Sequence, residues 1–454
     1  MNKCTVRSNK IDMCNGPIAW KLLLFAGPLM LSSILQLMFN AADVIVVGKF
    51  AGDNSLAAVG SVSSVVNLLV NFFMGLSIGA NVMASRYYGS KDDEGLSKVL
   101  HTSMLVSVIS GVLLLSIGVP FAGQILKWMQ SPPEVIGLAT LYLRIYFLGM
   151  PASMVYNFGS AILRAVGDTK RPMYYLTFSG VVNVILNLIF VIAFGMDVAG
   201  VAIATVVSQI ISAALVVRCL MKETGALKFS FSKLSIDKML MGKIVSIGLP
   251  ASIQSMLFSF SNVIIQSSVN SFGATILAGN SAGQSVEGFV YVAMNAFYQA
   301  CISFVSANVG AGNYKRINPI VLRAELLVAA VGILAGNLVY LLRYQVLSLY
   351  TDSPAVMEAA AIRLAYIVIP YFLCGIMDTM VGALRGLGYS ILPMIVSLIG
   401  ACGLRLFWIF TFFQLPAFHE PKYLYITYPV SWAITFMAHL ICYTIVYRKN
   451  YVNK

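Results

Sequence analysis

Four polar residues recur at helical spacing within an otherwise apolar stretch between residues 18 and 47. They are Ser33, Gln36, Asn40 and Asp43. Because residues three and four apart lie on one face of a helix, the four form a single polar stripe. An ionisable side chain inside hydrocarbon is costly and is therefore a candidate functional group. We interpret the stripe as lining a polar cleft, with Asp43 as its reactive member.

Further polar residues occur on two later apolar stretches. Asn183 and Asn187 are four residues apart and share a helix face, and Thr205 lies a few residues inside the next stretch. At ~1.5 Å per residue, Asn187 and Thr205 reach the same depth in a ~30 Å hydrocarbon core. A first helix that is tilted, or kinked at Pro28, brings Asp43 level with them.

A carboxyl group among amide and hydroxyl oxygens has two physical uses in a low-dielectric site. It can exchange a proton near neutral pH, because desolvation disfavours its charged form, or it can hold Na⁺ with the hard oxygen ligands around it. Either use makes Asp43, Asn183 and Asn187 a candidate coupling-ion site. The alternative is that Asp43 is solvated at the outer membrane surface, while the two amides hydrogen-bond neighbouring helices.

The equivalent stretch later in the chain has a similar stripe without the acid. Ser255 and Asn262 continue the pattern, but Ile265 stands where Asp43 would be. We therefore predict a cavity-lining role for both stripes and ion binding for the first alone.

Other charged residues inside predicted spans need partners of their own. Glu287 and Arg405 differ in predicted depth by only ~5 Å, so we predict that they pair, either as a structural salt bridge or for gating or recognition of substrate charge. Asp378 is predicted to pair with Arg385 near one membrane surface. Arg363 is predicted to extend outward to solvent.

The composition places these residues in a membrane. Of 454 residues, 59% are apolar before Gly is counted and 10% are charged, whereas soluble domains contain about 25% charged residues. At about 20 apolar residues per span plus a short loop, the chain accommodates around twelve helices. The predicted spans are residues 18–47, 55–79, 99–120, 135–157, 172–194, 199–220, 240–266, 274–300, 319–342, 355–380, 391–413 and 424–447. The predicted fold class is an all-α polytopic membrane protein, which excludes a soluble enzyme.

The positive charges indicate orientation and location. The net charge is +13, and most Lys and Arg fall on alternate loops, as they do on the cytoplasmic side of multi-pass proteins. We predict that both termini are cytoplasmic and that the protein lies in the cytoplasmic (inner) membrane. The charge is attributed to these loops and not to nucleic-acid binding. The apolar run after the basic start is too long for a secretory signal, so we expect it to be retained.

The chain repeats itself at an offset of about 221 residues, which indicates two six-span halves. The clearest stretch has the pattern Leu-Arg, then Gly, then Pro-Met, and occurs at residues 163–173 and 384–394. Because each half has an even number of spans, the repeat is parallel and related by an axis along the membrane normal. We predict an N-lobe at residues 1–220, a cytoplasmic linker at 221–239 and a C-lobe at 240–454.

Over nearly its whole length the chain resembles the multidrug and toxic compound extrusion (MATE) family of cation-coupled antiporters. The matching motifs are Gly27-Pro28, Gln36, Asp43 and Val47-Gly48, the loop at residues 163–168 before Pro172, Asn183 with Asn187, and the run at residues 200–205. The resemblance implies a MATE-like fold of twelve helices in two six-helix lobes. It also implies a secondary active transporter that exports lipophilic, often cationic, drugs or metabolites by alternating access and antiport with H⁺ or Na⁺.

The resemblance further implies a coupling site in the N-lobe. Its members here would be Asp43, Asn183, Asn187, Thr205 and Asn157, with Na⁺, if it is the ion, held at the first three. One branch of the family has additional acids in the seventh and tenth helices, and the seventh span here has none, so N-lobe coupling is favoured. We expect no organic cofactor, small amphiphilic or cationic substrates and the lipid bilayer as partners, and a monomer.

Functions from other classes are the alternatives. A related flippase of lipid-linked oligosaccharides would need more cleft cations than Arg405, and a membrane sensor or channel would show no counterflow in vesicles. An intramembrane enzyme would need a His-Glu-x-x-His motif, paired Asp, or Ser with His, and the three His are far apart. The seven Cys show no metal-ligand or disulfide spacing, so we predict that the protein is not an enzyme.

Overall fold

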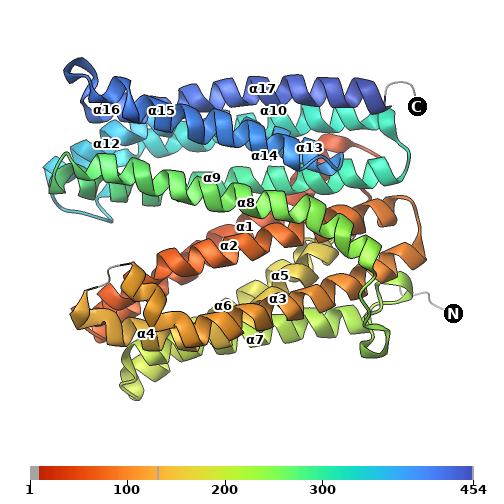
Figure 1. The fold of residues 1–454 in the computed structure, drawn as a ribbon, viewed down its shortest axis with the longest axis horizontal. Coiled ribbons are helices and arrows are strands. Elements are labelled where there is room, and N and C mark those ends of the chain that lie inside the picture. The colour runs from red at the N-terminus through yellow and green to blue at the C-terminus, as the bar shows by residue number, and fades with distance from the viewer. Residues whose placement is uncertain (1–9, 130–131, 452–454) are drawn as a thin grey trace. The chain divides into compact units, whose positions relative to one another are not determined.

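The computed structural model describes residues 10–129 and 132–451, and every regular element within them is helical (Figure 1). Eleven helices are long and apolar enough to cross a membrane. The pair α4 (Pro133–Leu148) and α5 (Met150–Ala165), bent by 47°, supplies one more span. The prediction of an all-α protein with twelve spans is therefore confirmed for the described chain. Apolar sequences of this length form helices because lipid offers backbone N–H and C=O groups no other partners.

The two halves of the chain contain corresponding series of helices. The first half contains α1 (Ile18–Phe50), α2 (Asp53–Gly89), α3 (Asp93–Trp128), α4, α5, α6 (Lys170–Leu188), its π-helical continuation η1 (Ile189–Ala193), and α7 (Asp197–Lys222). The short turns η2 (Gly225–Leu227) and η3 (Phe231–Lys233) follow. The second half contains α8 (Lys238–Asn270), α9 (Ala274–Gly310), α10 (Tyr314–Leu341), α11 (Arg343–Leu347), α12 (Pro354–Ile367), η4 (Ile369–Tyr371), α13 (Phe372–Gly386), α14 (Ile391–Ser397), η5 (Leu398–Gly403), α15 (Leu404–Phe410), η6 (Phe412–Gln414), η7 (Pro416–Phe418), α16 (Pro421–Tyr425) and α17 (Thr427–Tyr451).

The chain divides into two compact units, and α1 and α8 each contribute to both. The N-unit comprises residues 31–252 and the segment that precedes residue 12, and the C-unit comprises residues 12–30 and those from 253 onward. Each division falls close to a proline inside the helix, Pro28 in α1 and Pro250 in α8. A proline removes a helical hydrogen bond and favours a kink at such a point. The lobe limits at residues 220 and 240 stay predictions.

The internal repeat is visible at the starts of corresponding helices. The helices α2 and α9 each have 37 residues. Each follows a glycine with positive φ, 85° at Gly52 and 89° at Gly273. Residues with a side chain rarely adopt this conformation, so glycine is required at both turns.

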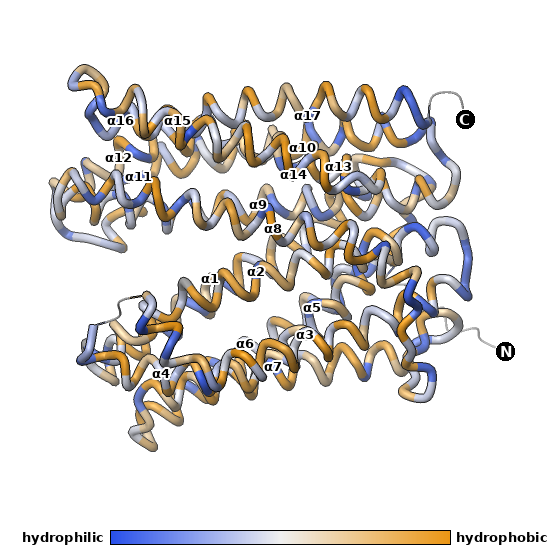
Figure 2. Tube along the Cα trace, in the orientation of Figure 1, coloured by the Kyte–Doolittle hydropathy of each residue, from blue (hydrophilic) through white to orange (hydrophobic). Residues whose placement is uncertain are grey.

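Residues of high hydropathy occur along the length of the helices in both halves of the chain (Figure 2). On α17 the exposed apolar side chains recur at intervals of three or four; they are Val430, Ile434, Met437, Ile441 and Ile445. This spacing places them on one face of the helix. An exposed apolar stripe of this length is expected where a helix contacts lipid and not water.

Gly167 and Asp168, from the loop at residues 163–168, have structural roles. The amide of Ile11 donates to the Gly167 carbonyl at 3.0 Å. A Cβ at Gly167 would lie 2.2 Å from the carbonyl oxygen of Ile11, and its φ is 85°, so both space and conformation require glycine. The buried Asp168 carboxylate accepts hydrogen bonds from the backbone amide and the guanidinium of Arg171. The loop thereby holds the start of the described chain against the N-unit.

Glu223 strengthens this attachment through two cations. Its Oε2 lies 2.7 Å from Lys10 Nζ, and its Oε1 lies 2.5 Å from Arg171 Nη1. Burial would raise the pKa of Glu223, but the hydrogen bonds from Lys10 and Arg171 hold the pKa below its ordinary value of 4.5. The folded state therefore binds fewer protons than the unfolded state near this pH. The contribution of Glu223 is present above pH 4.5 and is lost as the pH falls through the folded-state pKa.

Replacing this carboxylate tests the attachment. We expect Glu223→Gln to leave the N-unit folded at neutral pH but to make the Ile11 amide exchange with deuterium about fivefold faster, because local opening costs less when both ion pairs are gone. Hydrogen exchange with mass spectrometry measures this directly. In the unsubstituted protein the same acceleration, corrected for intrinsic rates, should appear as the pH is lowered below 4.5. Glu94→Gln, which removes the exposed pair of Glu94 with Lys98, is the control, and equal protection in both variants would rule out the role of Glu223.

Candidate cation site

The candidate site lies in the N-unit, where α1, α6 and α7 bring four polar side chains together. The Nδ2 of Asn187 donates to Asp43 Oδ1 and lies 3.4 Å from Asn183 Oδ1. The Nδ2 of Asn183 lies 3.4 Å from Thr205 Oγ1. Three helices therefore contribute to one connected set of amide, hydroxyl and carboxyl groups.

The approach of α1 to α6 depends on a glycine. A Cβ at Gly180 would lie 2.0 Å from Cε2 of Phe39, so the Phe39 ring occupies the space of a side chain there. Asp43 is about one turn beyond Phe39 and Asn187 about two turns beyond Gly180. The small residue thus lets the carboxyl group of α1 reach the amide of α6.

The amides of the site are sealed from solvent, whereas its carboxyl group is half-buried. Asn187 is 0% exposed and Asn183 is 5% exposed. The Oδ1 atom of Asn187 is buried and accepts no hydrogen bond, although its amide contacts Asp43. A buried acceptor without a donor is costly. A proton on Asp43 or a Na⁺ bound beside it would supply this oxygen with a partner.

The remaining predicted residues lie outside this cluster in the part of the chain that the structure describes. Asn157 on α5 donates to the carbonyl oxygen of Ser153, in its own helix, at 2.9 Å. On α1, Gln36 and Asn40 are exposed and Ser33 is half-buried. The stripe therefore faces away from the packed interior of the N-unit at Gln36 and Asn40. On α8, Asn262 is exposed and Ser255 is half-buried in the same way.

The predicted pairing of Glu287 with Arg405 is wrong. Glu287 on α9 forms a bidentate ion pair with Arg363 on α12, with Nε to Oε1 at 2.7 Å and Nη2 to Oε2 at 2.8 Å. Arg363 is 4% exposed and does not extend outward to solvent as predicted. Counting residues gives the depth of a side chain in the membrane but not its direction around the helix axis.

Arg405 has no acidic partner within 4.0 Å among residues 10–129 and 132–451. Its Nε donates to Ser431 Oγ at 2.8 Å, and its guanidinium lies 4.2 Å from the centroid of the Tyr428 ring and 5.6 Å from that of Trp432. Its buried Nη2 makes no hydrogen bond. Aromatic faces stabilise this buried cation in place of a carboxylate.

The predicted pair of Asp378 and Arg385 is also wrong. Arg385 donates to the Tyr298 hydroxyl and, at 2.8 Å, to Gln254 Oε1. No ion pair joins it to Asp378 within the described ranges. The guanidinium instead donates from its two Nη atoms to neutral acceptors inside the C-unit, and its buried Nε makes no hydrogen bond.

Sequence reasoning missed three residues of interest. Tyr142 and Tyr146 on α4, whose rings stack with centroids 6.2 Å apart, lie within electrostatic range of Asp43. Their four-residue spacing within a predicted span was the available signal. Glu325 on α10 has two buried carboxylate oxygens without a hydrogen-bond partner. An acid inside an apolar run was the signal there.

Curated relatives of the chain are described as multidrug resistance proteins. It is 28% identical to the probable multidrug resistance protein YoeA of Bacillus subtilis, over 96% of each chain. It is 25% identical to the probable multidrug resistance protein NorM of Thermotoga maritima, over 87% of this chain and 86% of that one. It is 21% identical to the multidrug export protein MepA of Staphylococcus aureus, over 82% of each.

Solved structures with low sequence identity share the fold. An outward-facing multidrug resistance transporter of the MATE family matches with a TM-score of 0.90 at 21% identity, over 99% of each chain. A transporter of the same superfamily from Pyrococcus furiosus matches with a TM-score of 0.89 at 21% identity, over 98% of this chain and 99% of that one. The two-lobe MATE architecture is therefore the fold of this protein.

The MatE family model matches the chain twice, at residues 28–189 and 250–411. The same spacing separates the two starts and the two ends, so Asp43 corresponds to Ile265 and Asn187 to Ile409. The matches cover most of the chain and include both helices that supply the central contact of the candidate site. The protein therefore belongs to the MatE family, the MATE multidrug efflux transporters.

Proposed function

We propose that this protein exports small lipophilic, often cationic, compounds from the cytoplasm by antiport with H⁺ or Na⁺, and that Asp43 carries the coupling ion. The observation that carries the proposal is the contact between the half-buried Asp43 and the buried Asn187, whose Oδ1 atom has no hydrogen-bond partner. The names of the relatives, which describe multidrug resistance and export, support the class of cargo. The clustering of basic residues on alternate loops supports a cytoplasmic membrane location with cytoplasmic termini.

The amide of Asn187 can serve both states of the carboxyl group. A charged Asp43 accepts a hydrogen bond from Asn187 Nδ2, as it does here. A protonated Asp43 would donate to Asn187 Oδ1 after the amide turns over, which satisfies the oxygen that now lacks a partner. For Na⁺, the same oxygen would act as a ligand together with Asp43 and Thr205, which are hard donors of the kind that ion prefers.

Exchange follows if ion and cargo exclude one another. A ligand shifts a conformational equilibrium only by its difference in affinity between two states. A cation at Asp43 that favours one opening, and cargo that favours the other, are therefore coupled through that equilibrium. The ion gradient then supplies the free energy for net export, and no covalent reaction is needed.

The residues of the second half that correspond to Asp43 and Asn187 support a coupling-ion site in the first half alone. Ile265 and Ile409, the counterparts of Asp43 and Asn187, belong to a single apolar cluster in the C-unit. Ile265 is 3% exposed and Ile409 is 2% exposed. A pair of aliphatic side chains offers neither charge nor oxygen to an ion, so the C-unit has no equivalent of the Asp43 site at this position.

Flux measurements with imposed gradients test the proposal. Purified protein in proteoliposomes should accumulate a fluorescent organic cation against its gradient when ΔpH or ΔpNa is imposed separately, and cargo on the far side should accelerate counterflow. The gradient that drives accumulation identifies the ion. Flux that only equilibrates the cargo under both gradients would mean a channel or sensor and would refute antiport.

Removing the side-chain amide of Asn187 should weaken binding of the coupling ion more than binding of the cargo. We expect Asn187→Ala to raise the concentration of coupling ion needed for half-maximal efflux about tenfold, because a hydrogen bond to a charged group contributes about 1.5–3 kcal/mol. Cargo affinity, measured by equilibrium fluorescence binding, should change little. Asn337→Ala is the matched control, since Asn337 is exposed on α10 and bonds its own helix at 2.8 Å. Weakened cargo binding with unchanged ion dependence would instead place Asn187 in the cargo site.

A further inference from the structure

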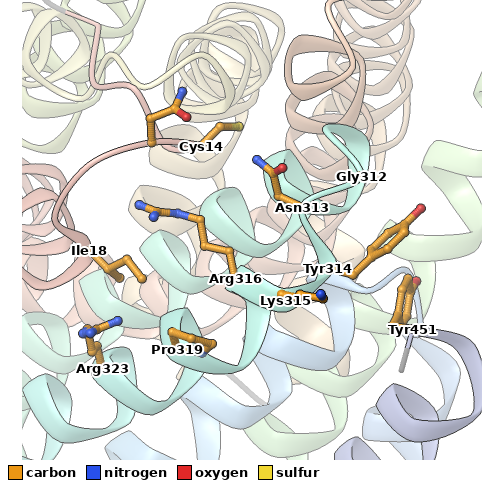
Figure 3. Close-up of a pocket in the computed structure, with 11 residues that line it drawn as sticks. Cys14, Ile18, Gly312, Asn313, Tyr314, Lys315, Arg316, Pro319, Arg323 and Tyr451 are labelled. Atoms are coloured by element: carbon orange, nitrogen blue, oxygen red, sulfur yellow. The ribbon is translucent and has the colours of Figure 1, made fainter. Parts of the chain in front are cut away.

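A cavity of about 630 Å³ lies at the end of the C-unit where α10 begins. Three segments that are distant in sequence form its walls (Figure 3): the stretch from Cys14 to the start of α1, the first turns of α10, and Tyr451 at the end of α17. Its volume is within the range of about 300–1,000 Å³ that small-molecule sites occupy. The rings of Tyr314 and Tyr451, with centroids 5.2 Å apart, form one side of the cavity.

Three cations and no acid are among the described residues that line the cavity. Lys315 and Arg323 are exposed, and Arg316 is half-buried. Arg316 Nη2 donates to the Gly16 carbonyl at 2.6 Å, while its buried Nε makes no hydrogen bond. None of the three forms an ion pair with an acid of the described chain, whereas Lys10, Lys21 in α1 and Arg171 in α6 all do. The positive charge around the cavity is therefore not neutralised by any acid of residues 10–129 and 132–451.

The corresponding helix of the first half shows that the fold does not require this charge. In α3, Asp92 caps the helix through a 2.8 Å bond to the Gly95 amide, and Asp93 and Glu94 occupy the first turn. The first turn of α10 has no acid and contains Lys315 and Arg316 in its place. Acids are favourable at the start of a helix and cations are not. The reversed charge is thus placed against the preference of the helix, as expected where cations serve a ligand.

We propose that this cavity binds a phosphate group, carried by the headgroup of an anionic phospholipid or by a soluble phosphate compound. The guanidinium groups of Arg316 and Arg323 suit phosphate oxygens in charge and geometry. This end of the C-unit is the predicted cytoplasmic end, where basic pockets among membrane helices meet anionic headgroups. The bound phosphate would join the amino-terminal segment, α10 and the end of α17, and so stabilise the C-unit by mass action.

The thiol of Cys14 offers a readout that does not depend on transport. Cys14 lines the cavity and is half-buried, so an occupant should shield it from a neutral maleimide. The full-length protein is placed in nanodiscs of phosphatidylcholine, of phosphatidylcholine with phosphatidylglycerol, or of phosphatidylcholine with added inorganic phosphate. Labelling at Cys14 is followed by peptide mass spectrometry. At about 90% occupancy, labelling should slow about tenfold.

Two variants separate binding from folding. Lys315→Gln with Arg323→Gln removes two cations and keeps the bond of Arg316 to Gly16, and it should abolish the protection of Cys14. Lys238→Gln with Lys243→Gln removes the same charge from exposed positions on α8 and should retain the protection.

Each outcome decides the proposal. Protection by phosphatidylglycerol alone identifies a lipid headgroup, and protection by inorganic phosphate in phosphatidylcholine identifies a soluble ligand. Equal labelling in all three conditions, protection that persists without Lys315 and Arg323, or equal loss in the control variant would overturn it. The antiport proposal would stand in those cases, because it rests on Asp43.

Discussion

Replacing Asp43 by asparagine is expected to reduce gradient-driven efflux to the leak of protein-free liposomes. Asparagine has the shape of aspartate and can still accept a hydrogen bond from Asn187, but it can neither bind a proton nor neutralise Na⁺. Without the ion, the imposed gradient no longer shifts the equilibrium between the two openings. A coupling free energy of about 3 kcal/mol corresponds to a loss of about 100-fold. Accumulation of cargo in proteoliposomes under ΔpH or ΔpNa measures the effect.

A matched carboxylate shows whether the loss is specific. Glu134 is exposed in the first turn of α4, so Glu134→Gln removes the same charge from outside the cluster and should leave efflux unchanged. Asp43→Asn should retain the thermal stability of the unsubstituted protein, which separates lost coupling from lost folding. Near-normal accumulation by a folded Asp43→Asn protein would show that the coupling ion binds elsewhere.

Breaking the ion pair of Glu287 with Arg363 is expected to cause the largest loss of stability. Both side chains are at most 6% exposed, and Arg363 Nη1 also donates to Asn280 Oδ1 at 2.6 Å. Glu287→Gln removes the charge that balances Arg363, and an uncompensated buried charge costs about 3–5 kcal/mol. The thermal midpoint of the purified protein in detergent should fall accordingly. Glu287→Gln with Arg363→Gln together should cost less than the sum of the two single variants, because they contact each other directly.

An exposed ion pair of the same unit provides the comparison. Glu420 and Lys422 lie 2.6 Å apart with side chains 55% and 41% exposed. A solvent-exposed pair contributes little to stability because water and salt screen it, so Glu420→Gln should change the thermal midpoint little. Additive losses at Glu287 and Arg363, or losses equal to that of Glu420→Gln, would show that the buried pair does not act as a unit.

That the polar side chains of the site reach a common level could be predicted from sequence, because helices rise by a fixed amount per residue. Asn183 and Asn187 share a face at four-residue spacing, and the same counting placed Thr205 level with them. The structure brings these three together with Asp43. Their role as a coupling site stays a prediction.

The direction of a side chain around its helix could not be predicted in the same way. Glu287 and Arg405 have matching depths, yet Glu287 faces Arg363, because the packing of α9 against α12 decides which faces meet. Asn157 shows the same limit, since a resemblance between motifs does not show that its amide bonds within its own helix. The close approach of α1 to α6 depends on Gly180 and Phe39, a complementarity of shapes that periodicity does not contain.

The apolar cluster around Ile265 and Ile409 bears on how much net charge the proposed transport cycle moves across the membrane. Under the antiport proposal, hydrocarbon in place of Asp43 and Asn187 leaves one ion to be loaded at these two equivalent positions in each turnover. Exchange of one H⁺ or Na⁺ for one monovalent organic cation then moves no net charge, so membrane voltage neither drives nor opposes it. A neutral or divalent cargo would instead feel about 2.3 kcal/mol per 100 mV for each uncompensated charge. The steepest concentration ratio that a monovalent cargo can reach is then the ratio of the ion itself across the membrane.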